Sequence, residues 1–160
     1  MKKLLYLIIC VYFINPNLKS QTSDYISLTS FIQSGLKEKI TDKIIVVNFW
    51  SINDKSSRDA NLDLNSTVSI FKDAKLKGGF KGVIGITICM DNDEVGAGIT
   101  LKKDGVNSLI NVNSSELSLV SFIKSKSASK NIAYDSNGLV VFENIQNVTF
   151  LNSIRNLITR

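Results

Sequence analysis

The chain contains no histidine, and its 160 residues include only one proline and two cysteines. Without histidine, no imidazole is available to activate a serine or cysteine nucleophile or to ligate a metal. The single proline, Pro16, and one cysteine, Cys10, lie among the first 20 residues. The rest of the chain therefore has only Cys89, which cannot form a disulfide within that part of the protein.

The first 20 residues have the layout of a secretory signal. Lys2 and Lys3 precede an apolar run over residues 4–14, and a polar break over residues 15–17 leads to Ser20. This pattern predicts a signal peptide over residues 1–20 and export to the periplasm or the extracellular space. The alternative is a membrane anchor, but the run is shorter than the roughly 20 residues that a spanning helix needs. We therefore expect no stable membrane span after cleavage.

The net charge of +5 overstates how basic the exported chain would be. Three lysines and no acidic residue fall in the first 20 positions, which leaves 16 basic against 14 acidic side chains. This balance gives no reason to expect binding to nucleic acid or to a membrane surface. The length and the 44% hydrophobic content are those of one domain with a substantial core.

Hydrophobic periodicity predicts an α/β fold. A helical extension is expected over residues 21–41, because Leu28, Phe31 and Ile32 recur at helical spacing. The later elements are a strand over 43–50, a helix over 57–76, a strand over 83–90, a helix over 94–103, a strand over 108–112, a helix over 115–124, a hairpin over 131–142 and a helix over 148–158. Early crossovers and a late hairpin predict a mixed central sheet with helices on both faces.

Two segments carry a resemblance to a known family. Asn48-Phe49-Trp50 ends a buried strand, and Arg58 follows in the next helix; later, an apolar strand runs into Asp135-Ser136-Asn137-Gly138 and returns. Because of these two segments, the part of the chain over 42–160 resembles the thioredoxin superfamily. Within that superfamily it is most similar to the TlpA-like extracytoplasmic thiol–disulfide reductases. The resemblance implies a thioredoxin-like domain that ends in a β-hairpin and a C-terminal helix.

The active-site motif of that family is altered in this chain. Matching the strand and Arg58 places the two family cysteines at Asp54 and Ser57, and counting back from Asp135 places the family proline near Ser129. Asp54 cannot form a disulfide, and Ser57 has no histidine to activate its hydroxyl. The resemblance thus implies a redox-inactive scaffold that binds a protein or peptide, with no cofactor and no metal.

Binding through this loop has a simpler alternative. The candidate binding residues are Trp50, Asn53, Lys55 and Arg58, beside the segment over residues 125–130. Asp54 or Ser56 could instead cap the helix, with Arg58 as a solvated residue of its first turn. A capped helix end can still receive a ligand, so the two interpretations are compatible.

Two further features allow a chemical and a structural interpretation. Cys89 is either the reactive thiol of an oxidoreductase or peroxidase-like enzyme, or a buried structural cysteine. Asp91, Asp93 and Glu94 form either a site for a hard cation or a solvated loop, and Val95 breaks the EF-hand pattern.

Overall fold

The computed structural model describes residues 23–35, 39–145 and 149–157, so the expected signal peptide lies outside the described residues. One five-stranded sheet has the order β3-β2-β1-β4-β5. Its strands are β1 (Ile44–Trp50), β2 (Val83–Cys89), β3 (Ile110–Asn113), β4 (Asn131–Tyr134) and β5 (Val140–Glu143). Strands β1, β2 and β3 are parallel, whereas β4 is antiparallel to both β1 and β5. The mixed sheet and the late hairpin are as predicted.

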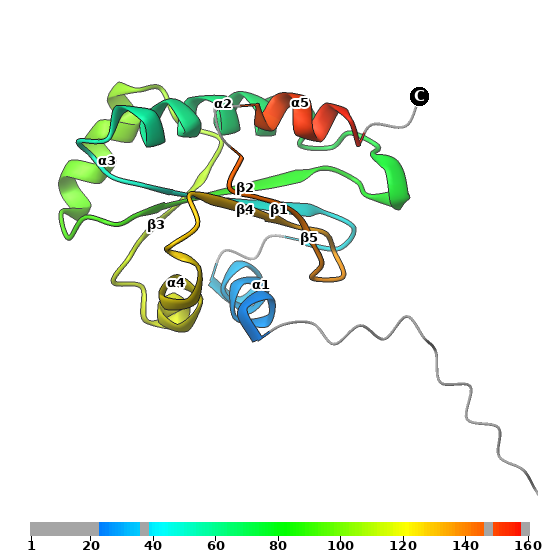
Figure 1. Cartoon of the computed structure of the whole chain (residues 1–160), viewed down its shortest axis with the longest axis horizontal. Coiled ribbons are helices and arrows are strands. Elements are labelled where there is room, and N and C mark those ends of the chain that lie inside the picture. The colour runs from blue at the N-terminus through cyan, green and yellow to red at the C-terminus, as the bar shows by residue number, and fades with distance from the viewer. Residues whose placement is uncertain (1–22, 36–38, 146–148, 158–160) are drawn as a thin grey trace, which may run out of the picture.

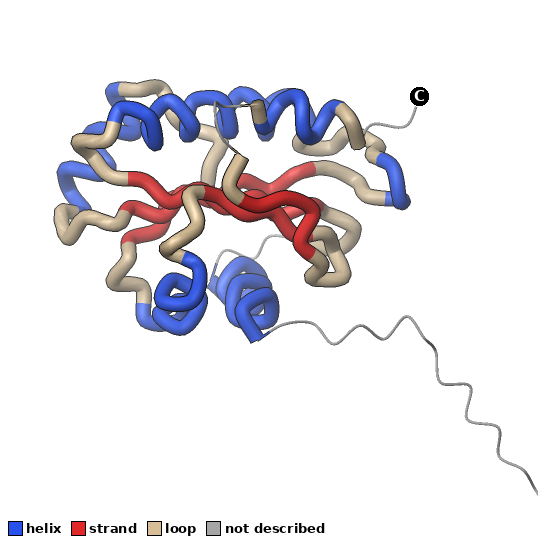
Figure 2. Tube along the Cα trace, in the orientation of Figure 1, coloured by secondary structure: helices blue, strands red, loops and turns tan. Residues whose placement is uncertain are grey.

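Helices cover both faces of the sheet. They are α1 (Ser23–Gly35), α2 (Lys55–Phe71), α3 (Glu94–Lys103), α4 (Val120–Lys126) and α5 (Phe150–Arg155). Helices α2 and α5 lie over one face, and α1 and α4 lie over the other (Figures 1 and 2). The α/β architecture is therefore confirmed. Within the described ranges, no helix is long and apolar enough to cross a membrane.

Strand β1 is the centre of the core. All seven of its residues are buried, and so are all seven of its neighbour β2. Side chains alternate between faces along a strand. Ile45 and Val47 accordingly join the cluster that contains α1 residues, whereas Ile44 and Val46 pack with α2 residues. This burial on both faces explains why the sequence of β1 is a continuous apolar run.

Helix α1 packs against the sheet and the hairpin. Leu28 and Ile32 are fully buried, and the rings of Tyr25 and Tyr134 lie 5.6 Å apart. Tyr25 also lies against the hairpin turn, where a Cβ built on Gly138 would come within 2.7 Å of the tyrosine ring. The Asn-Gly turn thus serves both the hairpin and the docking of α1.

Helix α2 ends earlier than the sequence predicts. The sequence predicts a helix that continues to residue 76, but α2 stops at Phe71, before Lys72, Lys75 and Lys77. The chain then turns, and the side chain of Leu76 enters the core with 2% of its surface exposed. Burial of Leu76 therefore outweighs continuation of the helix, and the three lysines lie in a loop. The expected helix over 115–124 likewise begins as a 3₁₀ turn, Leu117–Leu119.

Candidate functional site

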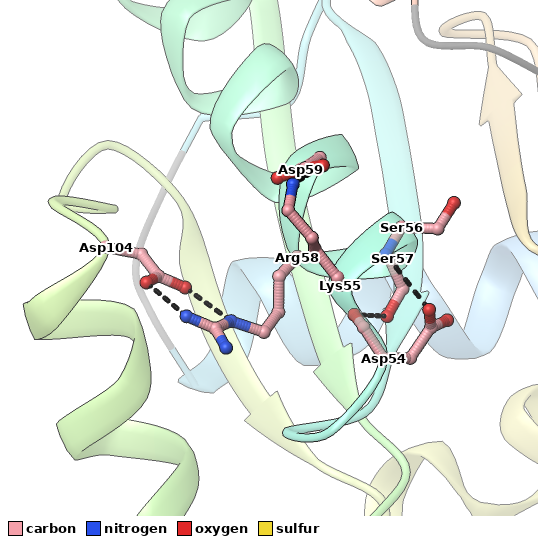
Figure 3. A network of polar contacts seen from close by, with 7 residues as sticks. All are labelled: Asp54, Lys55, Ser56, Ser57, Arg58, Asp59 and Asp104. Atoms are coloured by element: carbon pink, nitrogen blue, oxygen red, sulfur yellow. Dashed lines mark hydrogen bonds and ion pairs between the residues drawn. The ribbon is translucent and has the colours of Figure 1, made fainter.

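Asp54 and Ser57, where the resemblance places the two family cysteines, hold the loop between β1 and α2. Asp54 is the N-cap of α2, and its Oδ1 accepts a hydrogen bond of 3.0 Å from the backbone N–H of Ser56. Ser57 Oγ donates to the carbonyl of Asp54 at 3.0 Å (Figure 3). The same oxygen accepts a hydrogen bond of 3.2 Å from the N–H of Ser51. The capping interpretation of Asp54 is therefore confirmed.

Arg58 is anchored by an ion pair. Its Nε and Nη2 donate to the two carboxylate oxygens of Asp104, at 2.8 and 2.5 Å (Figure 3). The same hydrogen bonds lower the pKa of Asp104 and raise that of Arg58. The interpretation of Arg58 as a solvated residue is therefore wrong. Asn53 and Lys55 are exposed, and Lys55 Nζ pairs with Asp59 one turn along α2 at 2.5 Å.

Trp50 lies inside the protein. Only 1% of its surface is exposed, and it packs with Cys89, Ala97 and Leu101 in a small cluster beneath α3. The interpretation of Trp50 as a binding residue is wrong, because its side chain is buried. Its strand is central in the sheet and α3 covers its end, so the indole is part of the packing that supports the loop.

A hollow of about 140 Å³ opens beside the start of α2. It is lined by Asn48, Phe49, Asp54, Ser56, Ser57, Ala60, Lys130, Asn131, Ile145 and Phe150. Asp54 and Ser57 thus share one surface depression with Lys130, which comes from the segment before β4. The N–H of Phe49 donates to the carbonyl of Lys130 at 3.0 Å and holds the two segments together.

Ser129, near which the resemblance places the family proline, is not part of this lining. It is 7% exposed, and its hydroxyl donates a hydrogen bond to the carboxylate of Glu143 on β5. The N–H of Lys130, the next residue, donates to Asn144 Oδ1 at 2.8 Å. The segment before β4 is therefore tied to the end of β5 by two side-chain contacts.

A buried polar chain that the sequence analysis missed runs beneath the hollow. Asn48 Nδ2 donates to the carbonyl of Ser57 at 3.2 Å and to Asn61 Oδ1 at 2.8 Å, and Thr87 Oγ1 donates to the same oxygen at 2.6 Å. These contacts fix α2 to β1 and β2. An asparagine inside an otherwise apolar strand was the available signal, because a buried amide needs partners.

Cys89 is fully buried at the end of β2. Burial raises the pKa of its thiol, and its Sγ lies 3.8 Å from Asp91 Oδ2. A thiol that is inaccessible and protonated is a poor nucleophile. The geometry favours the structural interpretation of Cys89 over the enzymatic one.

The acidic loop after β2 also has structural partners. Asp91 Oδ2 accepts a hydrogen bond of 2.6 Å from the N–H of Ile52, and Asp93 caps α3 through the N–H of Gly96. Asp91 thus holds the loop over 51–54 from the neighbouring strand. In the part of the chain that the structure describes, no three acidic or cysteine side chains are grouped to hold a metal ion.

No family model matches this chain, and no curated protein matches it. Solved structures do. The thioredoxin domain of a thiol-disulfide oxidoreductase from Bacteroides vulgatus is 17% identical, with a TM-score of 0.60 over 74% of this chain and 81% of that one. A thiol:disulfide interchange protein from Bacteroides sp. is 18% identical, with a TM-score of 0.59 over 72% and 73% of the two chains.

A third similar structure comes from another genus. It is a secreted Mycobacterium tuberculosis disulfide oxidoreductase homologous to E. coli DsbE, 14% identical, with a TM-score of 0.54 over 72% of this chain and 83% of that one. Identities this low establish an architecture and no activity. The chain has the thioredoxin-like fold, as the order of its strands, its helices and these similar structures show.

Proposed function

We propose that this protein is an exported thioredoxin-like protein that performs no thiol–disulfide exchange and binds a protein or peptide partner. Export rests on the signal-like first 20 residues. Binding is assigned to the hollow beside the start of α2, where the loop over 51–58 meets the segment over 125–130.

One observation carries the loss of redox chemistry. The loop positions that the resemblance assigns to cysteines hold Asp54 and Ser57, and both side chains are committed to capping and closing the loop. Exchange needs an accessible thiolate. Cys89, the free cysteine of the described chain, is buried and does not line the hollow.

The shape and chemistry of the hollow support binding. Phe49, Ile145 and Phe150 give it apolar walls, while Asp54 and the ammonium of Lys130 stand among its lining residues. Six of the ten lining residues are polar, so the hollow suits one side chain of an extended peptide that combines polar and apolar groups.

Reduction of insulin disulfides tests the redox part. We expect the wild-type protein to match the blank that lacks it, and the Asp54→Cys/Ser57→Cys variant to gain activity on the same scaffold. Activity of the wild type that disappears in Cys89→Ser would instead establish the alternative, a thiol-dependent enzyme.

Panning of a random peptide library tests the binding part. Ser56→Trp should fill the hollow and abolish enrichment of the peptides that the wild type selects. Ser66→Trp, a matched change at an exposed position farther along α2, should leave enrichment intact. Equal enrichment by both variants would contradict binding at the hollow.

A further inference from the structure

A cluster of lysines lies at the end of the molecule opposite the candidate site. Residues 70–82 contain four lysines and one aspartate. We call Lys43, Lys72, Lys75, Lys77 and Lys81 the basic end. We propose that the basic end is a docking surface for a bilayer of anionic phospholipids, and this proposal does not depend on the proposed function.

The charges of the basic end are only partly compensated. Lys81 pairs with Asp42 at 3.1 Å, and Lys43 pairs with Asp73 at 3.3 Å. The remaining three lysines are exposed and form no ion pair with any residue that the structure describes. These three lysines also lie beyond the last residue of α2. Their positions are therefore not explained by a favourable interaction between lysines of the last turn and the helix dipole.

The backbone brings two of these like charges together. Lys75 and Lys81 are partners in an antiparallel β-bridge, with Lys77 in the turn between them. Directly opposed residues have Cβ atoms about 5 Å apart, and like charges at such positions destabilise the pair. A surface with many negative charges would convert this repulsion into attraction, whereas a single carboxylate could pair with only one of the lysines.

An apolar hollow adjoins the basic end. Its volume is about 290 Å³, and Lys43 and Lys72 lie beside the apolar residues Val83, Ile84 and Leu109 in its lining. Ile70, in the last turn of α2, is 59% exposed. Apolar groups beside lysines match the boundary between phospholipid headgroups and acyl chains, and this complementarity favours a bilayer over a purely polar polyanion.

Docking in this way leaves the candidate site free. Helix α2 begins at the site and has 17 residues, so about 25 Å separate its two ends. Figure 1 shows the loop after α2 and the start of α2 at opposite ends of the sheet. A protein bound by its basic end would direct the loop over 51–58 away from the bilayer.

Co-sedimentation with vesicles tests the proposal. The full chain should bind vesicles of equal parts phosphatidylglycerol and phosphatidylcholine more strongly than phosphatidylcholine alone, and about 0.5 M salt should weaken this preference. The Lys72→Gln/Lys75→Gln/Lys77→Gln variant should lose at least tenfold in affinity for the anionic vesicles. The residues before position 23 are common to all variants, so differences between variants report on the basic end.

A matched variant removes the same charge elsewhere. Lys102→Gln/Lys103→Gln/Lys124→Gln alters three exposed lysines on α3 and α4 and should keep at least half of the wild-type affinity. Equal losses in the two triple variants, equal binding to both kinds of vesicle, or no vesicle binding at all would overturn the proposal. Binding to a short DNA duplex without vesicle binding would also overturn it and would assign the basic end to a polyanion. Circular dichroism of each variant confirms that it is folded.

Discussion

Arg58 in the first turn of α2 and Asp104 at the C-cap of α3 form an ion pair through two parallel hydrogen bonds. The pair is partly buried, with 31% and 13% of the two side chains exposed. A two-point contact of this kind fixes orientation as well as distance. Arg58 and Asp104 are 46 positions apart in sequence, and their pair holds the start of α2 beside the end of α3.

Asp104→Asn should destabilise the protein at neutral pH, with a fall in Tm of about 2–4 °C. The hydrogen bonds from Arg58 lower the pKa of Asp104 in the folded state. Its contribution is therefore present above the usual aspartate pKa of about 3.9 and is lost as the pH falls through the lowered value. Thermal denaturation should show a gap between wild type and variant at pH 7 that narrows near pH 2.

Lys55→Ala is the control for this measurement. The Lys55–Asp59 pair is also an ion pair of α2, but its side chains are 86% and 47% exposed. Solvent screens such a pair, so the Tm should change by less than about 1 °C. A pH-independent gap for Asp104→Asn would contradict the role of the carboxylate.

Gly138→Ala should destabilise the protein more than Gly105→Ala. Both glycines have positive φ, +80° and +75°, so both alanine variants carry a backbone penalty of about 1 kcal/mol. A Cβ at Gly138 would also lie 2.7 Å from the ring of Tyr25, whereas one at Gly105 would meet nothing within 4 Å. We expect about 1–3 kcal/mol more for Gly138→Ala in urea denaturation, since the ring must move. Equal costs would show that the packing of α1 on the turn is unimportant.

The buried amide chain should respond cooperatively to substitution. Asn61→Ala removes the acceptor of Asn48 and Thr87 and should cost about 3 kcal/mol, whereas Thr87→Val should cost about 1 kcal/mol. Asn61 and Thr87 share one hydrogen bond. The variant with both substitutions should therefore lose at least about 0.5 kcal/mol less stability than the sum of the two single variants. Chemical denaturation of the three variants completes this cycle, and strict additivity would mean that the bond contributes nothing.

Cys89 should resist alkylation in the folded protein. Its side chain is fully buried, so the alkylating reagent cannot reach it, and its raised pKa keeps the thiol protonated. Peptide mapping after iodoacetamide treatment at pH 7 should find Cys89 unmodified in native protein and modified in denaturant. Rapid native modification would instead reopen the enzymatic interpretation of this thiol.

The order of elements could be predicted because it depends on local pattern. The buried strands β1 and β2, the helix over 94–103 and the Asn-Gly hairpin are all where periodicity and turn chemistry place them. The end of α2 could not be predicted in this way. Residues 72–76 are compatible with further helix, but the chain turns after Phe71 and places Leu76 in the core against residues distant in sequence.

The sequence by itself determined what the loop cannot do. The absence of histidine, of a second cysteine near Cys89 and of cysteines at Asp54 and Ser57 is a matter of composition and spacing. Those facts leave the loop over 51–58 without a thiol of its own, however the chain folds.

The tertiary structure decided how the remaining side chains are used. It buries Trp50 and Cys89, commits Arg58 to Asp104, and places Lys130 beside Asp54 in one hollow. It also gathers Lys43, which precedes β1, and the lysines of the loop after α2 at one end of the molecule. Exposure, pairing and charge clustering depend on contacts between residues far apart in sequence, and such contacts exist only once the sheet has assembled.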